Sequence, residues 1–195
     1  MSKREITRAD IMDLADYTPG RKERRRDMMQ MKANRRIAVG PFATFYFENY
    51  ATMWHQVHEM LAIEKGGEAQ IPDELEAYNP LIPQGRELIA TVMIEIDDPI
   101  RRKTVLNRMG GFEEHMYLEL DGERISSRAE VDVDRTSAEG KASSVQFVHF
   151  ELTDAQADKM KQANTRAILG IDHENYAHMA VIPESARAEL GGDLD

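Results

Sequence analysis

The chain has no cysteine among its 195 residues. This absence excludes disulfides, thiol nucleophiles and zinc or iron–sulfur centres that are ligated by cysteine. No segment approaches the roughly 18 consecutive apolar residues of a membrane-spanning helix. The first residues, MSKREITRADIMDL, lack the continuous apolar stretch of a secretory signal. Together these absences favour a cytoplasmic protein that does not enter a membrane.

Several catalytic and nucleotide-binding motifs are also missing. The sequence has no GxSxG nucleophile elbow, no GxxxxGK[ST] phosphate loop and no GxGxxG dinucleotide fingerprint. Its glycine pairs, Gly66-Gly67 and Gly110-Gly111, are typical of helix ends. Nothing therefore indicates nucleotide hydrolysis or a dinucleotide cofactor, and the sequence leaves open whether the protein is an enzyme.

Basic residues are concentrated at the start of the chain. Residues 1–36 hold eleven Lys/Arg and six Asp/Glu, a net charge of +5, whereas residues 37–195 hold fourteen and twenty-nine, a net charge of −15. We therefore divide the chain into a basic N-terminal helical arm, residues 1–36, and a single α+β domain, residues 37–195. No nucleic-acid-binding motif and no interleaved aromatic residues accompany the arginines, which argues against nucleic acid. The arm is instead expected to dock on a partner protein or on the chain's own acidic surface.

The hydrophobic pattern predicts an α+β fold, an antiparallel or mixed sheet with helices packed mainly on one side. Residues 88–96 are apolar on both faces, which is typical of a central strand. Residues 36–47 have the composition of one strand kinked at Gly40-Pro41. Further strands are predicted at 115–120 and 124–133 (a hairpin about Asp121-Gly122), 145–152 and 166–171, helices at 21–35, 50–64, 72–78, 98–109, 153–164 and 183–190, and a polar loop at 134–143.

The helix predicted after Asn49 carries the most chemically suggestive side chains. At about 100° per residue its apolar residues form one sector centred on Val57. His55 and Glu59 lie opposite this sector, and His58 lies nearer its edge. Spacings of three and four residues allow these side chains to converge on one ion, and imidazole with carboxylate suits Zn, Fe or Mn. The alternative is plain surface, because the side opposite an apolar stripe normally faces solvent.

Other ionisable residues are less decisive. Glu64 lies within the apolar sector of the same helix, where a buried carboxylate would need a partner. Its place in the last turn favours the other outcome, a side chain that bends into solvent. His115, on the polar face of its strand, is a candidate ligand from a second element. His149 shares a strand face with apolar residues and is predicted to be a hydrogen-bonded core histidine.

Four segments of the chain resemble, in order, the bacterial and archaeal family called domain of unknown function 3501. They are FENYATMWHQVHEMLAIE, ELEAYNPLIPQGRELIATVMIEIDDP, DRTSAEGKASSVQFVHFEL (with Arg135-Thr136-Ser137) and IDHENY. The resemblance implies a setting near rubrerythrin-like proteins and iron–sulfur oxidoreductases similar to glycerol-3-phosphate dehydrogenase. It also implies that relatives can carry other residues in place of His55 and His58. The acidic residues and His115 are then stronger candidates for metal ligands than these two histidines. The predicted metal-ligand set is Glu48, His55, His58, Glu59, Glu64 and His115.

These observations lead to two main hypotheses for function. The first is an accessory protein of a cytoplasmic redox or oxidative-stress system that binds a non-haem Fe, Zn or Mn ion and works with a redox protein or a second copy of itself. The alternative is a non-enzymatic adapter that docks a partner protein through the basic helix of residues 21–36. A third hypothesis is a metal-free enzyme that uses Glu95 or Asp172-His173 as acid and base.

Overall fold

The computed structural model describes residues 3–130 and 141–195 of the chain. Its strands form two sheets in which every pairing is antiparallel, so the predicted α+β class is confirmed. The first sheet has the order β1-β2-β3-β7-β6 and the second the order β5-β4-β8-β9. The strands are β1 (Arg36–Val39), β2 (Ala43–Phe47), β3 (Glu87–Ile94), β4 (Met116–Leu120), β5 (Glu123–Ser126), β6 (Arg128–Ala129), β7 (Val145–Glu151), β8 (Ala167–His173) and β9 (Tyr176–Val181).

The two sheets enclose the larger hydrophobic core. Phe45 of β2, Val92 of β3 and Phe150 of β7 meet Leu118 and Leu169 of the second sheet there. Since side chains alternate along a strand, the intervening residues of β2, β3 and β7 lie on the other face of the first sheet, which we call its outer face. The sequence prediction of a central strand at 88–96 is confirmed, because β3 lies between β2 and β7.

Residues 36–47 form a hairpin, so the prediction of one kinked strand is wrong. β1 and β2 pair with Ile37 opposite Phe45. Gly40 has a φ of 73°, a left-handed conformation that suits glycine and reverses the chain direction. The predicted hairpin at Asp121-Gly122 is confirmed, with Leu120 opposite Glu123. The predictions for residues 131–133, for 134–140 and for Arg135-Thr136-Ser137 lie outside the described residues.

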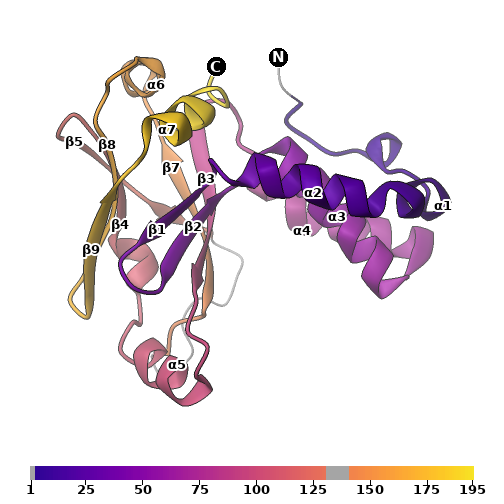
Figure 1. The fold of residues 1–195 in the computed structure, drawn as a ribbon, viewed down its shortest axis with the longest axis horizontal. Helices are drawn as coiled ribbons and strands as arrows, with labels where there is room; N and C mark the ends of the chain where they lie inside the picture. Colours follow the sequence, from indigo (N-terminus) through magenta and orange to yellow (C-terminus); the bar gives the residue numbers. More distant parts are fainter. Residues whose placement is uncertain (1–2, 131–140) are drawn as a thin grey trace.

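Helices α1 to α4 form a separate layer beside the first sheet (Figure 1). Their core joins Ile6 and Ile11 of the N-terminal arm to Val57 and Leu61 of α3, and reaches Ile89 on the outer face of the sheet. The helices are α1 (Leu14–Tyr17), α2 (Arg21–Lys32), α3 (Tyr50–Glu64), α4 (Ile71–Tyr78), α5 (Pro99–Leu106), α6 (Asp154–Lys161) and α7 (Glu184–Gly191). Across residues 3–130 and 141–195, no helix has the length and apolar character needed to cross a membrane.

The basic arm packs against the chain's own acidic residues at several points, among them Arg4 with Asp195 and Arg8 with Glu68. Arg21 binds Glu59 through two hydrogen bonds of 2.9 Å. Arg35, which is buried, binds Asp193 at 2.7 Å and Glu189 at 3.1 Å. Part of the arm's positive charge is therefore neutralised within the fold, although the division of the chain at residue 36 stays a prediction.

Candidate functional site

The junction between β2 and α3 sets the position of every candidate ligand on that helix. The backbone N–H of Glu48 still donates to Ile89 of β3 at 2.8 Å, which continues the strand pairing. Asn49 then caps the helix, because its side chain accepts from the N–H of Thr52 at 3.0 Å and the Thr52 hydroxyl accepts from the N–H of Asn49 at 2.9 Å. α3 consequently begins directly after the end of β2. One side of this helix faces the outer face of the first sheet, and the other side faces the arm.

His58 has both ring nitrogens bound to backbone groups. Nε2 accepts from the N–H of Met12 at 3.0 Å, so Nδ1 carries the proton and donates to the carbonyl of Trp54 at 2.7 Å. The ring is fully buried and lies against the Trp54 indole, with centroids 3.9 Å apart. Burial lowers the pKa of His58. In this arrangement the imidazole ties the arm to α3 and has no lone pair left for an ion.

His55 and Glu59 meet the arm in a second hydrogen-bonded network. The Tyr17 hydroxyl donates to Glu59 at 3.0 Å and lies 3.4 Å from Nδ1 of His55. Because this hydroxyl has only one proton, it is left to accept from Nδ1–H of His55. Nε2 of His55 then carries a lone pair, and within the described chain this atom has no hydrogen-bond partner.

The charges around this network fix its protonation. The hydrogen bonds from Arg21 hold the pKa of Glu59 below its ordinary value, and the Tyr17 hydroxyl acts in the same direction. Burial lowers the pKa of His55, and the nearby cations Lys32 and Arg25 lower it further, although Glu59 opposes this. At neutral pH, His55 is therefore a neutral imidazole beside an ionised, arginine-bound carboxylate.

A cavity of about 470 Å³ lies between α2 and α3, and His55 is among the residues that line it. Arg25 and Lys32, two helical turns apart on one side of α2, line it together with Arg36 at the start of β1. Glu59 is the acid in its wall, and Arg21 already binds both oxygens of that carboxylate. Apolar parts of the wall come from Met28, Met29, Met60 and Ile63. We call this space the basic cavity.

A second cavity, of about 430 Å³, lies against the outer face of the first sheet. Glu48 lines it and is only 5% exposed. Oε1 of Glu48 accepts from the Thr91 hydroxyl at 2.9 Å, whereas Oε2 is buried and has no partner among the residues that the structure describes. Lys32, Tyr46 and Gln56 line both this space and the basic cavity, so the two cavities adjoin. We call the second one the Glu48 cavity.

The other two predicted ligands lie elsewhere. Glu64, the last residue of α3, is exposed and accepts from Gln70 at 2.9 Å, so the predicted bend into solvent is confirmed. His115 is the last residue of a short 3-10 helix, Phe112–His115, directly before β4, so its predicted place on the strand is wrong. Its Nδ1 lies 3.3 Å from Asp172 of β8, and its ring meets His173 edge-on. Within residues 3–130 and 141–195, no three histidine or acidic side chains are grouped in a way that would hold a metal ion. The metal site stays a prediction.

Comparison with known proteins places the chain among its relatives. A family model described as a protein of unknown function, DUF3501, matches residues 5–194. The chain belongs to the DUF3501 family. It is also similar to a crystal structure at 1.90 Å resolution of a novel protein of unknown function from Burkholderia pseudomallei K96243, with 36% identity and a TM-score of 0.90 over 97% of this chain and 99% of that chain. No curated protein gives a significant match. The family predicted from the four sequence segments is thus confirmed.

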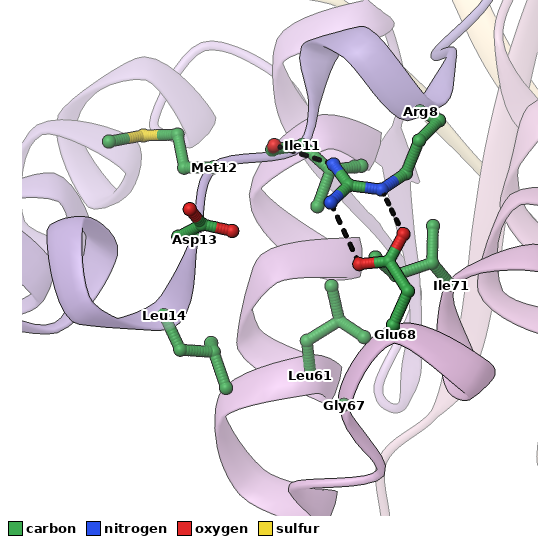
Figure 2. Close-up of a pocket in the computed structure, with 9 residues that line it drawn as sticks. All are labelled: Arg8, Ile11, Met12, Asp13, Leu14, Leu61, Gly67, Glu68 and Ile71. Atoms are coloured by element: carbon green, nitrogen blue, oxygen red, sulfur yellow. Dashed lines mark hydrogen bonds and ion pairs between the residues drawn. The ribbon is translucent and has the colours of Figure 1, made fainter.

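A third cavity of this DUF3501 protein is smaller, about 200 Å³, and lies where the arm crosses the end of α3 (Figure 2). Figure 2 shows the guanidinium of Arg8 bound to both carboxylate oxygens of Glu68, with Leu61 and Ile71 nearby. Arg8 and Glu68 satisfy each other, and Asp13 is the one other charged residue among those that line this cavity, so no cation is left there for an anionic ligand. The basic cavity and the Glu48 cavity are the stronger candidates.

Sequence reasoning missed several residues of these two cavities. Thr91 and Gln56 were not singled out, and Lys32 was counted only as part of the basic helix. Thr91 lies on the outer face of β3, two residues from the position opposite Glu48, so the pairing register of β2 with β3 was needed to find it. The available signal was Glu48 itself, a carboxylate at the end of an otherwise apolar and aromatic strand.

Proposed function

We propose that this DUF3501 protein binds a small organic anion in the basic cavity. The observation that carries the proposal is a set of three cations around one hollow. Arg25, Lys32 and Arg36 line it, and Arg25 comes no nearer than 3.9 Å to Glu59. In the described part of the chain, Lys32 and Arg36 form no ion pair. Carboxylate and phosphate groups are the usual partners of such cations in protein sites.

The size and walls of the cavity favour a small molecule over a polymer. Small-molecule sites typically enclose about 300–1,000 Å³ and are mostly apolar with a few placed polar groups. The basic cavity, at about 470 Å³, falls in this range and has methionine and isoleucine side chains between its charges. The preferred ligand therefore has one anionic group and an apolar body.

His55 gives the site a hydrogen-bond acceptor next to the cations. Its ring is held by Tyr17, which is held in turn by Glu59, so the lone pair of Nε2 has a fixed direction. A neutral imidazole accepts a hydrogen bond from a hydroxyl or ammonium of the ligand, and it can also take a proton from it. The arrangement therefore suits recognition of an anion that also carries an exchangeable proton.

The proposal is tested by titrating the ¹⁵N-labelled full chain with benzoate, phenyl phosphate and neutral benzamide at low salt. The two anions should shift amide signals of α2 and α3, and benzamide should not. Lys32→Gln and Arg36→Gln should each raise the Kd for the anions about tenfold, close to 1.4 kcal/mol, because each removes one charge-assisted contact. Lys103→Gln, on α5 at the far end of the first sheet (Figure 1), is the matched control and should leave Kd unchanged. Equal binding of benzamide and benzoate would refute the proposal.

The two hypotheses drawn from the sequence stay predictions beside this one. An accessory role in a redox system has no specific geometric support and rests on the family resemblance. The adapter hypothesis needs a narrower test, because the guanidinium of Arg24 lies 5.2 Å from the centre of the Tyr17 ring and donates to the Tyr17 carbonyl. Reversing Arg24 to Glu would therefore disturb packing, and reversing Arg25 would also change the proposed anion site. The exposed Arg26, which lines neither cavity, can be reversed to Glu to test docking of a partner alone.

A further inference from the structure

Glu48 is a buried acid in which only one of the two carboxylate oxygens has a hydrogen-bond partner among the described residues. Its Oε1 accepts from Thr91, but Oε2 has neither solvent nor a hydrogen-bond donor within the described chain. Buried carboxylates are normally paired with donors or cations, since an unpaired buried charge is strongly unfavourable. A buried carboxylate oxygen without a donor therefore indicates that a hydrogen-bond donor comes from outside the chain.

The surroundings of Glu48 define where that donor would lie. Glu48 lines the Glu48 cavity, and its apolar lining residues include Met53, Leu81 and Phe147. The last torsion of a glutamate side chain is broad, so the carboxylate can turn to present its unpartnered oxygen to the cavity. A donor group in this space would meet one carboxylate in largely apolar surroundings, where the attraction between opposite charges is strong.

The lining residues distinguish among the candidate donors. Glu48 is the only acid or histidine among them, whereas zinc takes three or four protein ligands and calcium six to eight oxygens. Lys32 also lines the cavity, yet Oε2 of Glu48 has no partner, so this ammonium does not satisfy it. A primary ammonium from a ligand supplies three donors, no acceptor and one positive charge.

We propose that the Glu48 cavity is a binding site for a primary ammonium group. The basic cavity adjoins it through Lys32, Tyr46 and Gln56. If the proposed anion site also holds, one molecule spans both cavities, with its anionic group at the cations, an apolar middle and its ammonium at Glu48. The ligand class is then a zwitterion such as an ω-amino acid.

The test compares hexylamine, hexanoate and 6-aminohexanoate on the full chain by NMR titration. Hexylamine should shift amides near Glu48 and Thr91. Glu48→Gln should weaken hexylamine and 6-aminohexanoate at least tenfold and leave hexanoate unchanged. If the two cavities hold one molecule, 6-aminohexanoate or a homologue of other length should bind at least tenfold more tightly than the matching alkanoate.

Controls separate a binding role from a structural one. Glutamine keeps the shape of Glu48 and still accepts from Thr91. Glu119→Gln, which changes an acid of the second sheet, should leave hexylamine binding unchanged. Val145→Trp narrows the cavity without altering Glu48 and should also weaken hexylamine, so the test does not depend on one variant.

The outcomes for the two proposals are distinguishable. Hexylamine binding that is lost in Glu48→Gln, with no binding of any carboxylate, supports the ammonium site and refutes the anion site. Hexylamine that binds equally to wild type and Glu48→Gln overturns the ammonium site. Absence of hexylamine binding at millimolar concentration also overturns it and leaves a buried water as the partner of Oε2.

Discussion

Replacing His58 by alanine tests whether this histidine joins the arm to α3 or serves as a metal ligand. The change leaves the N–H of Met12 without its acceptor, because Nε2 of His58 is its partner at 3.0 Å. It also removes a fully buried ring that packs on Trp54. A buried donor left unpaired costs about 1–3 kcal/mol, and truncation of a buried side chain of this size adds about 2–3 kcal/mol.

The expected loss is therefore about 3–6 kcal/mol, a large share of the 5–15 kcal/mol by which a typical domain is stable. Urea denaturation measures it, and amide hydrogen exchange of residues 3–32 locates it, since the arm should lose protection before the sheets do. His58→Phe keeps a ring of similar size and should recover about half of the loss. His115→Ala, at a half-exposed histidine, should cost under about 0.5 kcal/mol. A His58→Ala variant that matches wild type in stability but loses a bound metal would refute the structural assignment.

Two further predictions concern protonation and metal. Burial acts to lower the pKa of His149, but its hydrogen bonds to Glu87 and Glu130 outweigh burial and raise it, while Arg128 opposes them. The stability that follows from this raised pKa is fully present below the pKa of the unfolded state, near 6.5, and is lost as the pH rises through the pKa of the folded state. His149→Gln should therefore flatten this decline in the urea midpoints measured from pH 6 to 9. A pH profile identical to that of the wild type would contradict the prediction. The predicted Fe, Zn or Mn site is checked by elemental analysis of untagged protein. About one metal per chain, lost in Glu59→Ala, would support it, and less than about a tenth would contradict it.

The local elements were predictable because their signals are local. Asn49 marks the start of α3, Asp121-Gly122 marks the hairpin turn, and the two-sided apolar strand is central in the sheet. The predicted escape of Glu64 into solvent is also confirmed, since the last turn of a helix leaves a long side chain free to bend outward. In each case the deciding interaction lies within a few residues of the signal.

The partner of the histidine face of α3 was not predictable from the periodicity of that helix. The wheel places His55 and Glu59 opposite the apolar sector and favours solvent there, yet His55 is only 9% exposed because α1 and α2 cover it. The relevant signal lay about 40 residues earlier, in Tyr17 and in apolar arm residues such as Ile11 that join the core of α3. Contacts between distant segments depend on how the chain folds back on itself. A helical wheel describes a single helix and gives no information about which distant segment packs against it.

The structure divides the basic residues of the arm into those that pair with the chain's own acids and those that line the basic cavity. Arg21 and Arg35 are neutralised by the chain's own acids, whereas Arg25, Lys32 and Arg36 surround a hollow. The protein as a whole carries a formal net charge of −10, which opposes the approach of a free anion at low salt. A zwitterion has no net charge and avoids this repulsion, while each of its ends still finds an opposite charge inside. The acidic body and the two adjoining cavities therefore favour the same ligand class, and they do so for independent reasons.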